Sequence, residues 1–320
     1  MNRTGANRAA DHATTRIDAS IIIPFIIFTG VWGSTWIVIR DQVGVVPPQW
    51  SVAYRFMIAA FAMALVAMWK GQSLKMDRGG LIAALVLGVT QFSVNFNSVY
   101  AAERFITSGV VATVFAILLI PNSLLAWAFL DQKPSRRFLL AGLVAVCGVA
   151  LLFLHELRSS PASPHEIAIG LGLTLLGLIG ASSANVYQAG KEARRHPLLA
   201  LLAWSMAIGA MLDSALAFAI AGPPVAEARI GYWVGVIYLA LFGSVLCFAL
   251  YFPVVRKIGP GKAAYSSVLV PIIAMTLSTM FEGYRWSPLA IGGAVLAIGG
   301  MLLALAGRRR PTLVTAPDAA

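Results

Sequence analysis

The chain carries little charge for its length. Of its 320 residues only 12% are Asp, Glu, Lys or Arg, whereas 59% are hydrophobic. Soluble domains contain about 25% charged residues, roughly twice this share. A fold in water could not bury so much apolar side chain, so the composition indicates a protein whose solvent is lipid.

Cysteine and histidine are also scarce, which excludes several kinds of site. Cys147 and Cys247 both lie inside apolar runs, without the spacing of a disulfide framework or a metal site. The four histidines lie in the N-terminal tail or in predicted loops: His12, His155, His165 and His196. Neither HExxH nor GxxxxGK[ST] occurs. We therefore expect no enzyme, no P-loop ATPase, no metal and no cofactor.

Long apolar runs are what the sequence has in abundance. A helix needs about 20 apolar residues to cross a bilayer, and no run alternates as barrel strands do. Ten runs qualify: 20–39, 48–69, 79–100, 108–130, 137–154, 168–188, 197–220, 231–254, 262–281 and 288–306. The sequence thus predicts an all-α membrane protein with ten transmembrane helices and short tails at residues 1–19 and 307–320.

The basic residues predict the orientation. The net charge of +11 would suggest nucleic-acid binding in a soluble protein, but here Lys and Arg lie in short segments between apolar runs. Six alternate segments hold three each, the five other loops hold one each, and Arg55 completes the 24. Because cytoplasmic loops carry the excess of Lys and Arg, we expect both termini in the cytoplasm and no nucleic-acid partner.

One pattern occurs twice, at an interval of about 150 residues. Gly109 precedes Pro121 by twelve residues, as Gly259 precedes Pro271. Past the prolines the interval joins three further pairs: Asp131 with Glu282, Gly142 with Gly293, and Gly148 with Gly299. The predicted halves, 20–155 and 166–306, hold five helices each. Five is odd, so the second half enters the membrane inverted, an arrangement typical of transporters with a site near the midplane.

Several segments resemble the drug/metabolite transporter superfamily. They are VWGSTWIVIR at 31–40, PPQWSVAYRF at 47–56 and the two proline-to-acid segments. The ten helices in two EamA-type halves are similar to the EamA transporters over residues 20–306, and the length and overall sequence resemble YddG-like amino-acid exporters. The resemblance implies a central cavity lined chiefly by the first, third, fourth, sixth, eighth and ninth helices, with the fifth and tenth as packing elements.

Amide side chains mark two candidate cavity faces. Gln91, Asn95 and Ser98 lie on one face of the third helix, and Asn185 and Gln188 lie on one face of the sixth. Amides facing lipid are costly, so both faces point into the bundle, either for substrate or for hydrogen bonds between helices.

Other candidates are aromatic or small. Trp32, Ser34 and Trp36 lie too deep for interfacial anchors, so they pack the bundle or form a substrate wall. Ser244 lies on a small-residue face of the eighth helix. Four tyrosines near helix ends are expected to be interfacial anchors, although the last also counts as a substrate-binding candidate: Tyr100, Tyr187, Tyr251 and Tyr265.

Charges and prolines inside the runs have two interpretations each. Arg55 is either a structural charge that anchors its helix or a clamp for a substrate carboxylate, and Asp213 is a candidate for proton coupling. Pro121 and Pro271 are possible hinges or simple bends. Asp131 is expected to be a structural cap or the partner of a nearby base.

The function that fits these features is secondary transport. We expect a protein of the bacterial inner membrane that exports small amphipathic metabolites, most simply neutral or aromatic amino acids, by alternating access. Its partners are a small-molecule substrate and the lipid bilayer, and it is a monomer or homodimer. The alternatives are multidrug efflux and a nucleobase or nucleotide-sugar carrier, with an intramembrane enzyme or a channel as distant ones.

Overall fold

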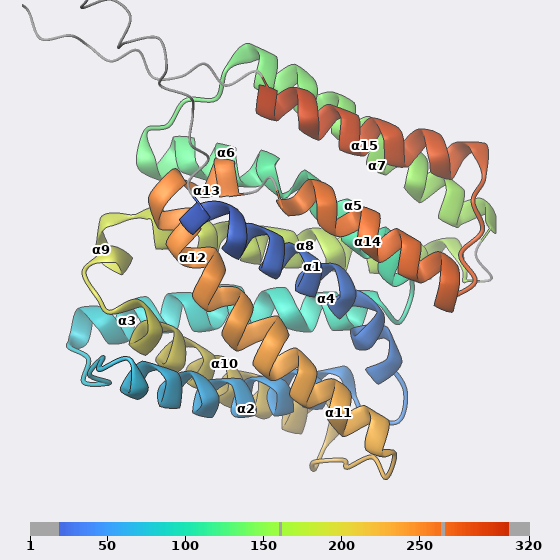
Figure 1. Ribbon diagram of the computed structural model, residues 1–320. Helices are drawn as coiled ribbons and strands as arrows, with labels where there is room; N and C mark the ends of the chain where they lie inside the picture. Colours follow the sequence, from blue (N-terminus) through green and yellow to red (C-terminus); the bar gives the residue numbers. More distant parts are fainter. Residues whose placement is uncertain (1–18, 160–161, 264–265, 307–320) are drawn as a thin grey trace, which may run out of the picture.

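The protein is a bundle of long helices that run roughly side by side (Figure 1). The computed structural model describes residues 19–159, 162–263 and 266–306, and all regular elements in these ranges are helical. In chain order they are α1 (Ala19–Gln42), α2 (Pro48–Trp69), α3 (Arg78–Leu87), η1 (Gly88–Asn95), α4 (Phe96–Ala102), α5 (Ser108–Phe115), η2 (Ala116–Leu118), α6 (Leu119–Leu130), α7 (Arg136–Ser159), α8 (Pro164–Ala189), α9 (Lys191–Arg194), α10 (Leu198–Ala221), α11 (Ile230–Tyr238), η3 (Leu239–Leu246), α12 (Cys247–Ile258), α13 (Pro260–Ala263), α14 (Ser266–Phe281) and α15 (Pro288–Ala306).

Eight helical segments in the described ranges are long and apolar enough to cross a membrane. They are Ser20–Gln42, Pro48–Trp69, Arg78–Ala102, Ser108–Leu130, Arg136–Ser159, Pro164–Ala189, Leu198–Ala221 and Ile230–Lys257. Two further apolar helices, Leu269–Phe281 and Pro288–Gly300, are shorter. The predicted all-helical membrane fold is confirmed, while the total of ten spans, the inverted order of the halves and the cytoplasmic termini stay predictions.

Side-chain caps and backbone conformation mark where two of the helices begin or end. Ser163 and Glu166 form a capping box at the start of α8, in which each residue's side chain accepts a hydrogen bond from the other's backbone. Asp131 ends α6 in the left-handed conformation, with φ of 55°. Among the described residues it makes no ion pair, so it acts as a structural cap.

His155 lies inside α7 rather than in a loop, where the sequence had predicted it, and its Nδ1 is 2.9 Å from the hydroxyl of Ser287.

Three of the spans are not regular α-helices: the fourth contains the 3₁₀ turn η2, and two others contain π-helical segments. The third contains a π-helical segment at Gly88–Asn95, and Ile230–Lys257 contains another at Leu239–Leu246. Both ends of the second segment follow those of the first by 151 residues, the same interval that relates the sequence motifs. A π-helical turn is rare and occurs often at functional sites. Its occurrence at equivalent positions supports the proposed internal repeat.

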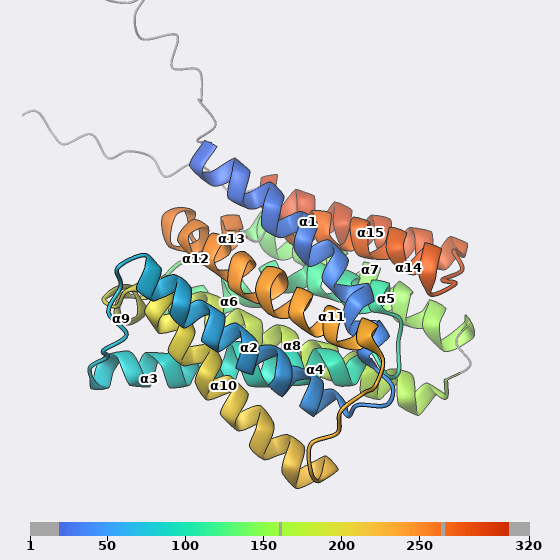
Figure 2. The same ribbon diagram turned by 60° about the horizontal axis from the view of Figure 1, so that its bottom comes forward.

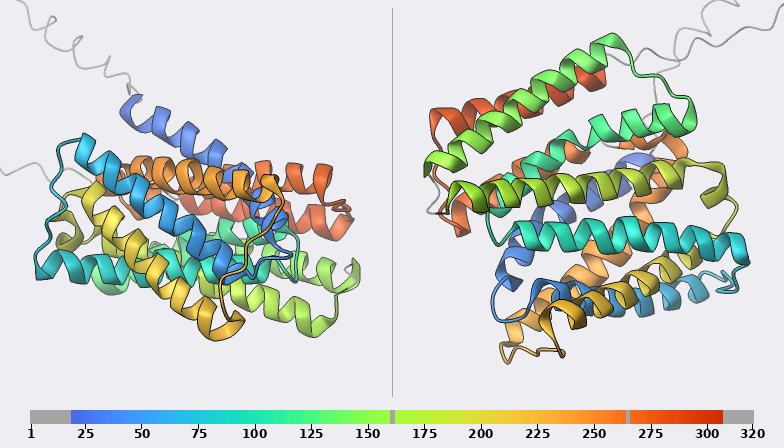
Figure 3. Two further views of the ribbon diagram at one scale, coloured as in Figure 1. Left: turned by 90° about the horizontal axis from the view of Figure 1, so that it is seen from below. Right: turned by 180° about the vertical axis from the view of Figure 1, so that it is seen from behind.

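The most extensive helix contacts join elements about 150 residues apart. α2 packs along α10 at one edge of the bundle, and α7 packs along α15 at the opposite edge (Figures 1 and 2). Between these edges, α8 lies against α5 and α6 on one side and against η1 and α4 on the other (Figure 3). Pairing of each edge helix with its counterpart is what a two-fold relation between the halves predicts.

Glycines bring the backbones of α7 and α15 together. A Cβ on Gly148 would lie 2.3 Å from the backbone nitrogen of Ala297, and one on Gly300 would lie 2.5 Å from that of Ala145. A Cβ on Gly293 would lie 2.8 Å from the carbonyl oxygen of Gly148. By contrast, a Cβ on Gly292 or Gly299 would meet no atom within 4 Å. Half of the glycines in α15 are therefore used for close packing within one chain.

We expect Gly148→Ala and Gly300→Ala to destabilise the protein, because the added methyl must push the two backbones apart. Overpacking of this kind costs about 1–3 kcal/mol. Gly299→Ala, one residue away on the open face, is the matched control and should leave stability unchanged or slightly raised, since Ala favours helix more than Gly does. Melting temperatures of the purified variants in one detergent test this. Equal values for Gly299→Ala and Gly300→Ala would contradict it.

Candidate functional site

A cavity lies in the middle of the bundle, between the two edge pairs. Its walls come from α1, α2, η1 with α4, α5 with η2, α8, α12 and α14. The family resemblance implied walls from the first, third, fourth, sixth, eighth and ninth helices, and the structure shows these walls with α2 in addition. The fifth and tenth helices, α7 and α15, contribute no lining residue. Water molecules could place their centres in about 120 Å³ of the cavity, and one water needs about 10–15 Å³. The space therefore suits a small metabolite.

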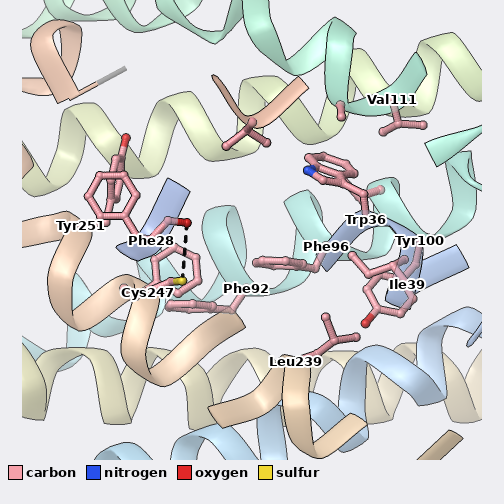
Figure 4. Close-up of a cluster of buried hydrophobic side chains, with 14 of the residues drawn as sticks. Phe28, Trp36, Ile39, Phe92, Phe96, Tyr100, Val111, Leu239, Cys247 and Tyr251 are labelled. Atoms are coloured by element: carbon pink, nitrogen blue, oxygen red, sulfur yellow. Dashed lines mark hydrogen bonds between the residues drawn. The ribbon is translucent and has the colours of Figure 1, made fainter. Parts of the chain in front are cut away.

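Aromatic rings form most of the wall. Trp32 on α1 lies against Tyr251 and Phe248 on α12, with ring centroids 4.9 and 5.5 Å apart. Trp36 lies against Phe115 on α5 at 5.4 Å. In Figure 4 the rings of Tyr251, Phe96 and Trp36 follow one band through the centre of the bundle. This surface favours a ligand with an apolar or aromatic part.

Arg55 is the single charged residue among the lining residues of this cavity. Its side chain is 1% exposed. The guanidinium Nε donates to the Ser244 hydroxyl at 2.9 Å, and Nη1 is 3.5 Å from the hydroxyl of Tyr100. Its Cζ lies 4.4 Å from the ring centre of Phe96. Among the described residues no carboxylate lies within ion-pair distance of Arg55. The cavity thus presents a positive charge without a counter-charge.

The π-helical segment η3 positions the partners of Arg55. Within it, the Ser244 hydroxyl donates to the carbonyl of Leu239, five residues earlier, and accepts the bond from Arg55. Gly243 leaves room for the guanidinium, since a Cβ there would lie 3.3 Å from Nη2. The carbonyl of Gly243 accepts a bond of 3.0 Å from the indole nitrogen of Trp32. One irregular turn therefore holds both the cation and an aromatic wall residue.

The other π-helical segment, η1, supplies amide groups. Gln91 and Asn95 both line the cavity, as does Asn185 on α8, whose side chain hydrogen-bonds the Tyr251 hydroxyl. Two buried polar atoms of the wall lack a hydrogen-bond partner among the described residues, the indole nitrogen of Trp36 and Oδ1 of Asn95. Buried polar groups are normally paired, so these atoms are available to a ligand or to water.

The remaining predicted site residues lie off the cavity wall. Ser34 pairs with the Tyr238 hydroxyl at 2.7 Å, and Gln188 accepts two hydrogen bonds from Arg256. Ser98 is buried beside Gly177, and Ser244 acts through Arg55. Tyr265 lies outside the described residues.

The structure corrects the interpretation of two tyrosines as interfacial anchors. Tyr100 is fully buried and donates a hydrogen bond to Gln42 at 3.1 Å, and Tyr251 is buried in the cavity wall. Both lie near the ends of the apolar runs, but their helices continue past them to Ala102 and Lys257. Neighbouring helices therefore cover both hydroxyls.

The two prolines differ in their surroundings. Pro271 lines the cavity from inside α14, whereas Pro121 follows the short 3₁₀ turn of η2 and does not line it. Asn122 does not repair the backbone bond that Pro121 removes, because neither of its side-chain polar atoms has a partner among the described residues. A hinge at either proline stays a prediction.

Asp213 is fully buried on α10 but does not line the cavity. Its Oδ1 accepts a hydrogen bond of 2.7 Å from Asn97, whose Nδ2 also donates to the carbonyl of Ser93 in η1. Asp213 is thus tied to the π-helical segment that carries Gln91 and Asn95.

Sequence analysis missed several aromatic wall residues. Phe96, Phe115 and Phe248 are apolar residues in apolar helices, and composition alone does not separate a cavity wall from a core. Phe96 and Phe248 could have been found from their positions in the sequence. Phe96 directly follows Asn95, a residue of a candidate cavity face, and Phe248 directly follows Cys247 on the eighth helix.

Several known proteins are similar in sequence to this chain, and two of the three described next are named as transporters. Protein PagO of Salmonella typhimurium is 25% identical over 283 residues, covering 85% of this chain and 91% of PagO. The uncharacterized inner membrane transporter YedA of Escherichia coli K12 is 28% identical over 261 residues, covering 81% and 82%. The uncharacterized transporter YyaM of Bacillus subtilis is 25% identical over 265 residues, covering 81% and 84%.

A solved crystal structure of 17% sequence identity has the same fold, with a TM-score of 0.67 over 89% of this chain and 96% of that chain. The sequence pattern of the EamA-like transporter family matches residues 20–154 and again residues 168–306. The apolar helices and the inner-membrane relative agree with a multi-pass protein of the bacterial inner membrane. The chain therefore belongs to the EamA-like transporter family, within the drug/metabolite transporter superfamily.

Proposed function

We propose that the protein exports neutral amino acids with apolar or aromatic side chains. The observation that carries this proposal is the buried guanidinium of Arg55, which faces the cavity without a counter-charge. A buried charge is costly unless it is paired, and a planar guanidinium binds a carboxylate with two parallel hydrogen bonds. A substrate that brings a carboxylate would complete this site.

The rest of the wall suits the other parts of an amino acid. Oδ1 of Asn95 lacks a partner and can accept a hydrogen bond from an ammonium group. The Trp36 indole nitrogen can donate to the carboxylate. The rings of Trp32, Phe96 and Phe248 can enclose the side chain. Both charged groups of the substrate would then have hydrogen-bond partners within one cavity.

Two inverted five-helix halves would supply the transport mechanism. In inverted-repeat transporters the site lies near the midplane, and exchange of conformations between the halves opens it to each side in turn. The matching π-helical segments and the paired edge helices support this arrangement here. We retain the predicted cytoplasmic termini and the likeness to YddG-like exporters as parts of the same proposal.

The positive charge of Arg55 also distinguishes between the alternative substrate classes. A pump for cationic drugs would place its substrate beside Arg55, where like charges repel. A carrier of nucleotide sugars would need several deep bases for two phosphates, and Arg55 is the one base of the cavity wall. An uncharged nucleobase is the alternative that the amides of Gln91, Asn95 and Asn185 fit best.

Uptake into proteoliposomes tests the proposed function. The panel contains phenylalanine, leucine, serine, adenine and a cationic dye, each with and without a pH gradient. Saturable uptake of phenylalanine and leucine is expected. Uptake of the dye or of adenine without amino-acid uptake would overturn the proposed substrate class.

Arg55→Gln should weaken transport of amino acids by about 10–100-fold in kcat/KM, because a charge-assisted hydrogen bond contributes about 1.5–3 kcal/mol. Competition experiments compare phenylalanine with phenethylamine, which lacks the carboxylate. Only competition by phenylalanine should fall, and Arg55→Lys should retain part of it. An equal loss for both ligands would assign Arg55 to structure alone.

Gln91→Ala and Asn185→Ala should raise the KM for transport without loss of folded protein. Both amides line the cavity, and each contributes about 0.5–1.5 kcal/mol as an uncharged hydrogen bond, or about 2–10-fold. Gln188→Ala, on the same helix as Asn185 but off the cavity wall, is the control. Unchanged kinetics in both cavity variants would remove the amides from the site.

Asp213 remains the proposed proton-coupling residue, through its link to η1 by way of Asn97. Asp213→Asn keeps the size of the side chain but not its charge. It should abolish accumulation driven by a pH gradient and spare exchange of labelled for unlabelled substrate. Persistent accumulation in this variant would exclude the coupling role.

A further inference from the structure

A second group of charged residues lies at the end of the bundle where α1 and α14 finish and α5 begins, on the right of Figure 1. It consists of Arg40 in the last turn of α1, Glu103 directly after α4, and Glu282 directly after α14. We call it the outer cluster, because the distribution of Lys and Arg predicts that this end faces away from the cytoplasm. The sequence pattern alone predicts no role for these residues.

Glu282 holds three cavity-lining helices together at this end. Its Oε2 accepts a hydrogen bond of 2.6 Å from the Ser108 hydroxyl at the start of α5, and Oε1 accepts one of 3.4 Å from the Ser108 backbone. The same carboxylate lies 3.6 Å from Nε of Arg40. Because α1, α5 and α14 all line the cavity, these contacts join three of its walls at the outer end.

Glu103 is the unusual member of the outer cluster. Its side chain is 0% exposed, and neither carboxylate oxygen has a hydrogen-bond partner among the described residues. An ionised carboxylate in such a place is very costly, whereas a neutral carboxyl is tolerated. A buried carboxyl that makes no structural hydrogen bond but faces a second carboxylate is a place for a proton.

The neighbouring charges agree with this state. Burial, and next the carboxylate of Glu282, raise the pKa of Glu103 well above its usual range, and the guanidinium of Arg40 lowers it less. The buried Tyr100 precedes Glu103 in the last turn of α4 and is near it, and Arg104 follows it in the chain. The positive charge of Arg40 thus compensates the negative charge of Glu282, and a bound proton keeps Glu103 neutral.

Water reaches the edge of the outer cluster. Arg40 and Arg104 both line an open surface depression of about 650 Å³, formed with residues 43–49 and the end of α10. A small separation of α1 from α14 would connect this depression to Glu103. Two arginines at its rim would then stabilise the ionised carboxylate.

We propose that Glu103 is a proton-binding site that controls the outer gate: the protonated carboxyl keeps the gate closed, and the ionised carboxylate opens it. Ionisation places a second negative charge opposite Glu282, which competes for Arg40 and weakens the contacts to Ser108. The proton enters from external water and returns to it. Since the closed state holds the proton more tightly, external acid closes the gate, and its closure is lost as pH rises. The proposal rests on the transporter function but not on the identity of the substrate.

Distance measurements by double electron–electron resonance test this without any substrate. The full-length protein, with Cys147 and Cys247 replaced by alanine, carries spin labels at Val45→Cys and Arg285→Cys, two exposed loop positions of which one follows α1 and the other follows α14. In nanodiscs we expect a short distance at pH 5 and a growing longer population towards pH 9. The Glu103→Gln variant, which stays neutral, should keep the short distance at every pH.

Glu166→Gln is the matched control. Glu166 lies in the first turn of α8 on the same predicted side, is exposed, and glutamine can replace it in the capping box. This variant should follow the parent protein. If the parent distances do not change with pH, or if Glu103→Gln still responds, the proposal is wrong.

A second variant covers the case in which Glu103→Gln does not fold. Glu282→Gln removes the like charge and weakens the closed gate, so the pH of half-opening should move to lower values. An unchanged midpoint would overturn the proposal. Absence of amino-acid uptake would instead overturn the proposed substrate and leave this result intact, because the distance measurement needs no transport.

Discussion

The structure depends on burying one cation in the middle of a membrane protein. Arg55 is buried, its charge meets no carboxylate among the described residues, and lipid cannot solvate it. Its stabilisation comes from dipoles and ring faces: the Ser244 hydroxyl, the Tyr100 hydroxyl backed by Gln42, and the ring of Phe96. The π-helical turn of η3 exists at the point where Ser244 must reach this guanidinium. Because these partners are uncharged, the positive charge of Arg55 is not compensated, and the site has an affinity for anions that a fully paired site would lack.

Both halves of the chain contribute residues to the surroundings of Arg55 and to the cavity wall. The first half supplies Arg55 from α2 and the amides Gln91 and Asn95 from η1. The second half supplies Ser244 from η3 and the aromatic residues Phe248 and Tyr251 from α12. Each half therefore contributes one π-helical turn from equivalent positions: η1 lines the cavity, and η3 holds Arg55 and Trp32, which line it. The edge pairs, α2 with α10 and α7 with α15, hold the halves together without lining the cavity, apart from Arg55 itself.

Sequence patterns predicted the eight long apolar spans of the described residues and three polar residues of the cavity wall for a simple reason. Amides in apolar helices must point into the protein, so Gln91, Asn95 and Asn185 were found from spacing alone. The π-helical turns were not predicted, because one wider turn changes the hydrophobic pattern too little to be detected. Tyr100 was mistaken for an anchor, because its distance from the helix end says nothing about the helices that cover it. Glu103 has the sequence signature of a loop charge, and its burial arises only from the tertiary contacts of α1, α4 and α14.

A structure of the protein in a lipid nanodisc with phenylalanine bound, determined by electron cryomicroscopy, is the most direct measurement of the role of Arg55. We expect the ligand in the central cavity, with its carboxylate on the Arg55 guanidinium, its ammonium group towards Asn95 and its ring among Trp32, Phe96 and Phe248. A ligand bound outside this cavity, or with its carboxylate turned away from Arg55, would contradict the assignment of Arg55 as the anchor for the substrate.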